Sequence, residues 1–234
     1  MSKDSLEDFQ GTPEQFAKMV AGGALNKFHE SFLKIQELMA CYRCAILEVE
    51  TKFRVLDEQF SLQHERNPID SIETRLKSAE SIFEKIKRKE LPLKLSSIEK
   101  SLSDVAGVRV VCSFVDDIYM LADCLLSQDD IRLIRKKDYI KNPKNNGYRS
   151  LHLIIEVPIF LQNEKKYMKV EVQLRTVAMD LWASLEHKLY YKKTISEKTA
   201  KSTAKQLSEC AAMCALLDEK MQSIKNEIDE DRLK

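Results

Sequence analysis

The apolar residues between Ala24 and Asn67 recur at alternating intervals of three and four residues, and this stretch contains neither glycine nor proline. The recurring residues are Leu25, Phe28, Phe32, Ile35, Met39, Tyr42, Ile46, Val49, Phe53, Leu56 and Phe60. A mean spacing of about 3.5 residues is typical of a helix that packs along one seam. We therefore predict one long N-terminal helix that follows Gly22 and Gly23.

The C-terminal part of the chain repeats this pattern, and no glycine or proline occurs after Pro158. Its seam comprises Leu207, Cys210, Cys214, Leu217, Met221, Ile224 and Ile228. We expect the two long helices to pack on each other or on a partner subunit. Another helix start is predicted at Thr12, where a threonine cap precedes Pro13 at the first helical position and Gln15 completes a capping box.

Between the long helices the apolar period changes from about 3.5 to about two residues, which is typical of strands. The alternating residues are Val108, Val110 and Cys112, then Leu151, Leu153 and Ile155, then Val170, Val172 and Leu174, with a shorter run from Ile131 to Ile134. Helices are predicted between them, over residues 75–89, 116–127 and 177–191.

This alternation predicts an α/β (α+β) fold: a mixed sheet of four to five strands with flanking helices and long N- and C-terminal helices. We divide the chain into an N-terminal helical region (residues 1–66), a core (residues 67–193) and a C-terminal helix (residues 194–234).

Glycine is scarce, and its scarcity excludes the common phosphate-binding loops. Only five glycines occur in 234 residues, so neither a P-loop nor a dinucleotide-binding fingerprint can be written. A bound phosphate must therefore rely on lysine and arginine side chains. The 38 basic and 37 acidic residues nearly cancel, which argues against a general nucleic-acid coat or a basic membrane-surface protein.

The first ten residues are polar, and no apolar run approaches the roughly 18 residues of a membrane-spanning helix. We expect a cytoplasmic protein without membrane contact, with its six cysteines as free thiols because the cytosol is reducing. Cys41 and Cys44 could share a zinc site with Cys210 and Cys214. Ordinary thiols are favoured, because only the C-terminal pair lies on its apolar seam, where both would pack as small apolar side chains.

Basic residues are concentrated in two segments. In the first, Lys77, Ser81 and Lys85 recur at intervals of four and would share one face of the helix predicted over residues 75–89, with Arg88 one turn later. Such a row of cations on one face is either a solvated surface or a binding site for an anion.

The second segment, residues 132–149, contains a single acid, Asp138. Its basic residues are Arg132, Arg135, Lys136, Lys137, Lys141, Lys144 and Arg149. A solvated charge run is one interpretation. The alternative is a nucleotide site, because Tyr148 adds an aromatic stacking surface beside the cations.

Acidic side chains occur at two points where they could take part in chemistry. Glu171, Gln173 and Arg175 share one face of a predicted strand, because side chains alternate across a strand. Asp104 precedes Gly107 at the start of another strand. It is either a turn residue or a Mg²⁺ ligand, since Mg²⁺ uses one or two carboxylates together with substrate phosphates and water.

Taken in order, these segments resemble the synthetase domain of RelA/SpoT-type (p)ppGpp synthetases. The matching motifs are Arg75-x-Lys77-x-x-x-Ser81-x-x-x-Lys85, Asp104-x-x-Gly107-x-Arg109, the run from Lys137 through Lys144, Asn146 and Tyr148 to His152, and Glu171-Val-Gln173-Leu-Arg175. The segment from Ala178 to His187, with Asp180 and Trp182, is similar to the single-domain members, the small alarmone synthetases. The resemblance covers residues 67–193 and includes no His-Asp dyad of the family's hydrolase domain.

The resemblance implies transfer of the β,γ-diphosphate of ATP to the ribose 3′-hydroxyl of GDP or GTP. Asp104 and Glu171 would bind Mg²⁺, and Glu171 would also be the general base. Arg75 and Arg109 would stack on adenine, because a planar guanidinium stacks on aromatic faces. The ATP phosphates would be held by Lys77, Ser81, Lys85 and Arg88.

On the acceptor side, the resemblance implies that Tyr148 stacks on guanine and that Asn146 and Asp180 bind its edge. An acid at position 180 could instead cap the following helix. The acceptor's ribose and phosphates would be held by Lys137, Lys144, His152 and Gln173.

Two rival functions remain open. One is the same transfer to another 3′-hydroxyl, on an adenine nucleotide or a tRNA end, and the other is a non-catalytic nucleotide- or RNA-binding regulator. The retained acids Asp104 and Glu171 favour catalysis. Leu33, Ala40 and Leu47 belong to a second apolar stripe that also includes Cys44. This stripe predicts a homo-oligomer, and the resemblance implies a tetramer.

Overall fold

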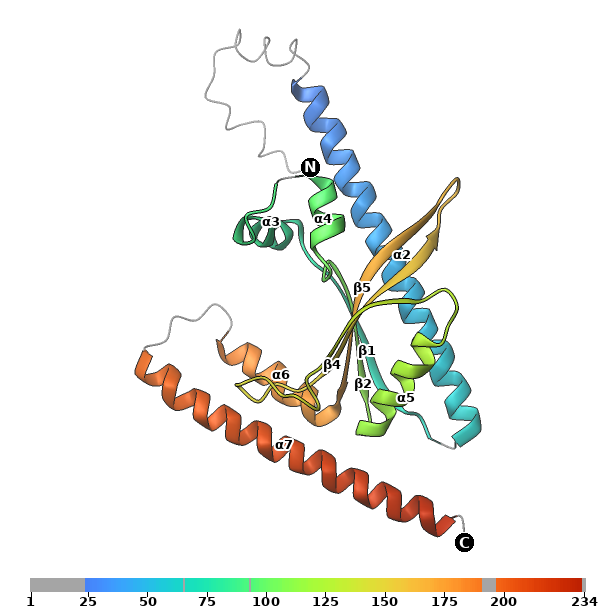
Figure 1. Cartoon of the computed structure of the whole chain (residues 1–234), viewed down its shortest axis with the longest axis vertical. Helices are drawn as coiled ribbons and strands as arrows, with labels where there is room; N and C mark the ends of the chain where they lie inside the picture. The colour runs from blue at the N-terminus through green and yellow to red at the C-terminus, as the bar shows by residue number, and fades with distance from the viewer. Residues whose placement is uncertain (1–23, 65, 93, 191–196, 233–234) are drawn as a thin grey trace. The chain divides into compact units, whose positions relative to one another are not determined.

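The computed structural model describes residues 24–64, 66–92, 94–190 and 197–232, so the helix predicted from Thr12 lies outside the described residues. Two compact units are distinguished, residues 1–41 and residues 42–234. The elements, labelled as in Figure 1, are α2 (Ala24–His64), β1 (Ile69–Leu76), α3 (Ala79–Arg88), α4 (Leu95–Ser101), β2 (Ala106–Cys112), α5 (Val115–Leu126), β3 (Arg132–Asp138), β4 (Leu151–Phe160), β5 (Lys165–Thr176), α6 (Val177–Tyr190) and α7 (Glu197–Arg232).

The second unit is built on a five-stranded sheet in the order β1-β2-β5-β4-β3. β2 runs parallel to β5, and the other neighbouring pairs are antiparallel. The predicted mixed sheet with flanking helices is confirmed. β5 is the central strand, so its side chains are surrounded by both neighbouring strands.

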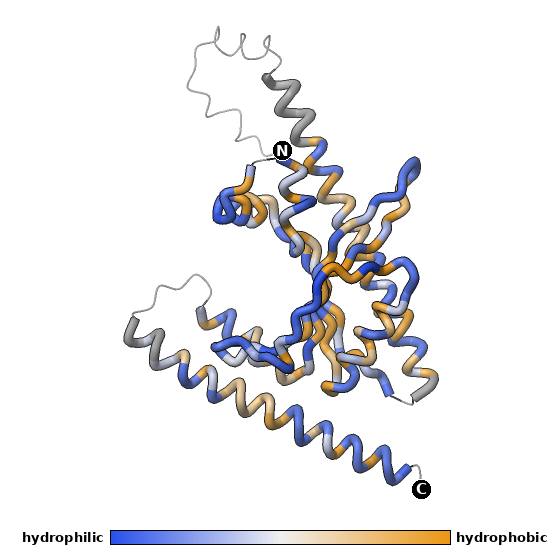
Figure 2. The backbone as a smooth tube through the Cα atoms, viewed as in Figure 1, coloured by the Kyte–Doolittle hydropathy of each residue, from blue (hydrophilic) through white to orange (hydrophobic). Residues whose placement is uncertain are grey.

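The two faces of β5 have opposite character, as its alternation predicts. Val170, Val172 and Leu174 are completely buried on one face, and Figure 2 shows apolar residues gathered along the strands. Glu171 and Gln173 lie on the other face, which carries polar side chains from the neighbouring strands as well. Burial of the apolar face holds β5 in the core, and the side chains of the polar face are available for binding and catalysis.

Helices supply the rest of the core. α5 packs against β2 and β5, and in Figure 1 it lies beside the sheet near the C-terminal part of α2. The predicted seam of α2 is buried from position 42 onward, at Tyr42, Ile46, Val49, Phe53, Leu56 and Phe60. The 3.5-residue pattern therefore identifies the packed face of this helix correctly.

The prediction of one helix over residues 75–89 is wrong. Arg75 lies in β1, Lys77 follows the strand, and the helix α3 begins only at Ala79. Ser78 takes an extended backbone conformation and caps the helix, its Oγ accepting a hydrogen bond from the N–H of Ser81. Lys77 and Lys85 therefore do not share a helical face. The strand gave no periodic signal because most of its side chains are exposed or half-buried.

The predicted seam of α7 is packed only in its first half, where the half-buried Leu207 and Cys214 pack against the cluster of Trp182, Ala183 and Ala211. α7 packs on α6 and α5, and its buried residues are Ala211 and Asp218. The later seam residues are about half exposed, namely Leu217, Met221, Ile224 and Ile228. Cys210 is exposed instead of packed, whereas Cys214 packs as predicted, and none of the six cysteines, all within described segments, forms a disulfide. None of the described helices is long and apolar enough to cross a membrane.

Candidate active site

A cavity of about 330 Å³ opens on the polar face of the sheet. Its lining comprises Glu73, Thr74, Arg75, Lys77, Asp104, Gly107, Val108, Arg109, Glu171 and Gln173. Strand register explains this convergence, because Arg75 lies opposite Gly107 and Gly107 lies opposite Glu171. Residues opposite one another in a ladder project on the same face of the sheet. Three neighbouring strands thus bring residues distant in sequence into one site.

Asp104 lies between α4 and β2 and is held by two lysines. Its Oδ2 accepts a hydrogen bond of 2.6 Å from Lys77 Nζ and another from Lys85 Nζ. Burial alone would raise the pKa of Asp104, but the hydrogen bonds and charges of Lys77 and Lys85 outweigh burial and lower that pKa. Its Oδ1 is buried and has no hydrogen-bond partner among the described residues. Asp104 is therefore ionised, with one free oxygen.

Glu171 projects into the same cavity from the central strand. Its Oε2 accepts a 3.0 Å hydrogen bond from Gln173 Nε2, and its Oε1 lies 3.4 Å from His152 Nδ1. Burial raises the pKa of Glu171, whereas His152 and Gln173 lower it, and the net shift is downward. The charge of Asp104 opposes that shift, because the two carboxylates are close enough to repel each other. Glu171 is therefore an ionised carboxylate at neutral pH.

Arg175 and Asp180 extend the polar face toward α6. The Arg175 guanidinium donates hydrogen bonds to Asp180 Oδ1 at 2.9 Å, to the Tyr148 hydroxyl at 2.7 Å and to Gln173 Oε1 at 3.1 Å. Arg109 Nη1 also lies 3.4 Å from Asp180 Oδ1. Asp180 therefore pairs with two arginines, and the residue that caps α6 is Thr176, whose Oγ1 accepts from the N–H of Met179.

The ring of Tyr148 belongs to the same polar network, through the hydrogen bond that its hydroxyl accepts from Arg175. Its hydroxyl lies 2.8 Å from His152 Nε2, and Lys144 Nζ lies 4.5 Å from the centre of its ring. Asn146 Oδ1 accepts a hydrogen bond from the N–H of Tyr148, while Asn146 Nδ2 donates to Glu186. The residues of the predicted nucleotide segment thus hold one aromatic ring beside cations.

The loop that carries Tyr148 rests directly on α7. Gly147 has a φ of +88°, and a Cβ there would lie 2.4 Å from the Cβ of Ala211. Trp182, Ala211 and the half-buried Tyr148 form one apolar cluster. Only glycine combines this backbone conformation with this close approach. The C-terminal helix therefore supports the loop that carries Tyr148.

On the opposite side of the cavity, Arg75 and Arg109 project from β1 and β2. Arg109 Nη1 donates a 3.0 Å hydrogen bond to Glu73 Oε2. Arg175 was predicted to share a strand face with Glu171 and Gln173, but no role was assigned to it. Glu73 was not predicted, because it lies in the strand that had no periodic signal.

Three predicted site residues contribute less than expected to this geometry. Ser81 is engaged in the cap of α3, Arg88 is an exposed residue at the end of α3, and Lys137 is exposed on β3 opposite His152. In the described part of the chain, the cavity lining includes none of these three.

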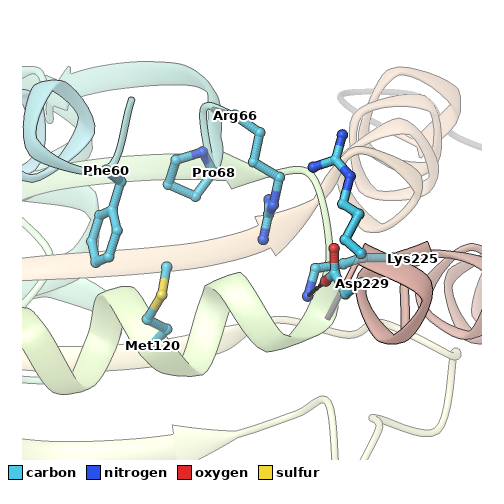
Figure 3. A pocket seen from close by; sticks show the side chains of 7 residues that line it. Phe60, Arg66, Pro68, Met120, Lys225 and Asp229 are labelled. Atoms are coloured by element: carbon cyan, nitrogen blue, oxygen red, sulfur yellow. Dashed lines mark ion pairs between the residues drawn. The ribbon is translucent and has the colours of Figure 1, made fainter. Parts of the chain in front are cut away.

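A second cavity, of about 380 Å³, lies between the end of α2, α5 and the end of α7. Figure 3 shows Phe60, Pro68 and Met120 beside the charged residues Arg66 and Lys225. These cations are already paired, Arg66 with Asp117 at 2.6 Å and Lys225 with Asp229 at 3.5 Å. It holds no pair of close carboxylates, so the Asp104–Glu171 cavity is the candidate for chemistry.

Residues 74–196 match the region found in RelA/SpoT proteins. The chain is 45% identical over 188 residues to the GTP pyrophosphokinase YwaC of Bacillus subtilis. The aligned segment covers 80% of this chain and 89% of that protein.

Two solved structures from Bacillus subtilis are similar as well. Small alarmone synthetase 2 superimposes with a TM-score of 0.73 at 43% identity, over 82% of this chain and 98% of that chain. Small alarmone synthetase 1 bound to its product pppGpp superimposes with a TM-score of 0.74 at 34% identity, over 83% of this chain and 98% of that chain.

Proposed function

The chain belongs to the RelA/SpoT family, and on that premise we propose that it is a small alarmone synthetase, a GTP pyrophosphokinase that makes (p)ppGpp. The observation that carries the proposal is the pair of ionised carboxylates, Asp104 and Glu171, in a cavity lined by Arg75, Lys77 and Arg109. Binding alone requires no such pair. Transfer of a diphosphate requires a base and charge neutralisation.

Glu171 is the proposed general base. It accepts the proton of the ribose 3′-hydroxyl of GDP or GTP, and the freed oxygen attacks the β-phosphorus of ATP. The new O3′–P bond forms as the bond between the β-phosphorus and the bridging oxygen of the α-phosphate breaks, and AMP leaves. Two observations support this role: Glu171 is ionised and can therefore accept a proton, and its carboxylate lies in the cavity.

Asp104 and Glu171 are the proposed holders of Mg²⁺. No group of three or more His, Cys, Asp or Glu side chains suited to a metal was found among residues 24–64, 66–92, 94–190 and 197–232. A two-carboxylate site suits Mg²⁺, which keeps water and takes further oxygens from phosphates. The unpartnered buried Oδ1 of Asp104 supports this fit. When held by Asp104 and Glu171, the ion would supply positive charge that neutralises the charge developing during transfer.

The remaining residues are proposed to hold the two nucleotides. Arg75 and Arg109 line the cavity where adenine would stack, and Lys77 and Lys85 would transfer from Asp104 to the ATP phosphates. Ser81 and Arg88 stay predicted contacts to those phosphates. On the acceptor side, guanine would stack on Tyr148. The proposed contacts to its edge, ribose and phosphates are Lys137, Lys144, Asn146, His152, Gln173 and Asp180.

We further propose a homo-oligomer, with a tetramer as the expected state. Val177, Leu181, Leu185 and Leu189 recur every fourth residue along α6 and are 49–56% exposed. The half-exposed apolar seam of α7 lies on the helix packed against α6. Large contiguous apolar surfaces are typical of subunit interfaces. A monomeric mass by light scattering at micromolar protein concentration would contradict the assembly.

The function is tested by incubating the protein with Mg²⁺, ATP labelled on its γ-phosphate and one acceptor nucleotide at a time, then separating the products. We expect label on the 3′ position of GDP or GTP and release of AMP. Labelling of adenine nucleotides or tRNA instead would identify another acceptor, and no transfer to any acceptor would indicate a binding protein.

The base assignment is tested with Glu171→Gln, with the surface variant Glu164→Gln as the matched control. We expect Glu171→Gln to lose at least about a thousandfold in turnover while it still binds nucleotide. Glu164→Gln should turn over like the parent protein. Undiminished turnover of Glu171→Gln would remove the assignment.

A further inference from the structure

Arg175 is the most buried cation near the site, with only 5% of its surface exposed. A buried charge requires a partner, and Asp180 supplies one at 2.9 Å. The remaining hydrogen bonds of its Nη2 point to Tyr148 and Gln173, which belong to the acceptor side and to the central strand. An ion pair with Asp180 could form at the protein surface without burial of Arg175. The hydrogen bonds of Arg175 to Tyr148 and Gln173 therefore indicate an additional role for this side chain.

A guanidinium only donates hydrogen bonds, and this fixes the direction of the bonds around it. Gln173 must present its Oε1 to Arg175, so its Nε2 is turned to Oε2 of Glu171, 3.0 Å away. A flipped Gln173 amide would place an N–H against the guanidinium and an oxygen against the carboxylate. Arg175 thereby selects the amide orientation that supplies a donor to Glu171.

Arg175 is also connected to Glu171 through the side chains of Tyr148 and His152. Because the Tyr148 hydroxyl accepts from Arg175, its own proton is directed to Nε2 of His152, 2.8 Å away. The proton of that imidazole then resides on Nδ1, which faces Oε1 of Glu171 at 3.4 Å. The opposite tautomer would set a lone pair against the carboxylate. Arg175 therefore selects a donor for the second oxygen of Glu171 as well.

Building on the proposed function, we propose that Arg175 is the positioning residue of the reaction: through Gln173 and through Tyr148–His152 it directs one donor to each oxygen of Glu171. The same hydrogen bond to the Tyr148 hydroxyl holds the ring on which guanine stacks. One buried side chain thus aligns the base with the acceptor whose proton it removes. Arg175 thus acts through Gln173, Tyr148 and His152.

The proposal is tested with Arg175→Lys, which keeps the charge but loses the planar fork of donors, and with Tyr148→Phe, which keeps the ring but loses the hydroxyl. For both variants we expect kcat to fall about 10- to 100-fold, because misalignment of a base by about 1 Å has effects of that size. The KM for ATP should change less than about twofold. Arg54→Lys, an exposed arginine on α2, is the matched control and should match the parent protein.

Two further measurements distinguish the proposed positioning role of Arg175 from a merely structural role in folding. Fluorescence of Trp182, the single tryptophan, and circular dichroism report whether each variant is folded. Added guanidinium should restore part of the kcat of Arg175→Ala, because it can occupy the space left by the side chain. If Arg175→Lys does not fold, Tyr148→Phe decides the outcome alone.

The proposal is overturned if folded Arg175→Lys and Tyr148→Phe both keep kcat within about twofold of the parent. It is also overturned if their loss appears only in the KM for ATP. These results differ from failure of the proposed function, in which the parent protein itself makes no 3′-diphosphate or Glu171→Gln remains fully active.

Discussion

The contact between Gly147 and Ala211 allows a quantitative test of how α7 supports the acceptor loop. In Gly147→Ala, the new methyl group would lie 2.4 Å from the Cβ of Ala211, with the backbone held at a φ of +88°. The left-handed conformation costs an ordinary residue about 1–2 kcal/mol, and relief of an overpacked contact costs about 1–3 kcal/mol. We therefore expect the free energy of unfolding to fall by about 2–5 kcal/mol.

The two contributions can be separated by a second substitution. Ala211→Gly removes the clashing methyl group but leaves the φ of Gly147→Ala unchanged, and by itself it costs about 1 kcal/mol as a glycine within a helix. The double variant should then lose less stability than the two single variants together, by the clash contribution of about 1–3 kcal/mol. The sign of the coupling free energy between the two substitutions follows from the short distance between the two Cβ positions alone.

The assay is urea unfolding followed by the fluorescence of Trp182, which packs in the same cluster as Ala211. Protein concentration is kept fixed, since assembly would shift the transition. Gly107→Ala is the control, because its Cβ would meet its nearest atom at an ordinary 3.7 Å, and it should cost less than about 1 kcal/mol. Strictly additive losses in the double variant would refute close contact between the loop and α7.

Two further predictions concern Tyr148 and Asp218. Tyr148→Ala should weaken binding of GDP or GTP at least about tenfold more than binding of ATP, because base stacking contributes about 1–3 kcal/mol; equal losses in calorimetric titrations would contradict the stacking role. Burial raises the pKa of Asp218 above its ordinary value despite its hydrogen bond from Thr176, so the folded state binds this proton more tightly than the unfolded state. The tighter proton binding by Asp218 stabilises the folded state at low pH, and this stabilisation is lost as the pH rises through the raised pKa of Asp218. Asp218→Asn should therefore gain stability relative to the parent as the pH rises from 4 to about 7, and a constant difference in urea midpoint would contradict this.

Strong periodic patterns allowed much of the fold to be predicted. β2, β4 and β5 each have a fully buried apolar face, and burial enforces alternation. β1 has one fully buried residue, Ile69, so its sequence carries little sign of a strand. The weak strand pattern of β1 also explains why the helix predicted over residues 75–89 began too early. There, Lys77, Ser81 and Lys85 at intervals of four residues imitated a helical face.

Site residues were predictable where motif and alternation agreed, as at Glu171 and Gln173. The convergence of Lys77 and Lys85 on Asp104 could not be predicted, because it depends on a strand, a cap and a short helix that fold back together. The seam of α7 illustrates a different limit. Periodicity identifies an apolar face but does not indicate whether the chain itself or another molecule covers it.

The site cations described above are neutralised by carboxylates before any nucleotide arrives. Asp104 holds Lys77 and Lys85, while Asp180 holds Arg109 and Arg175. A polyphosphate must compete with these internal counterions, so part of its binding energy is consumed in exchanging partners. These four cations consequently attract an unrelated polyanion less than unpaired cations would, and discrimination is obtained at the expense of tight ground-state affinity.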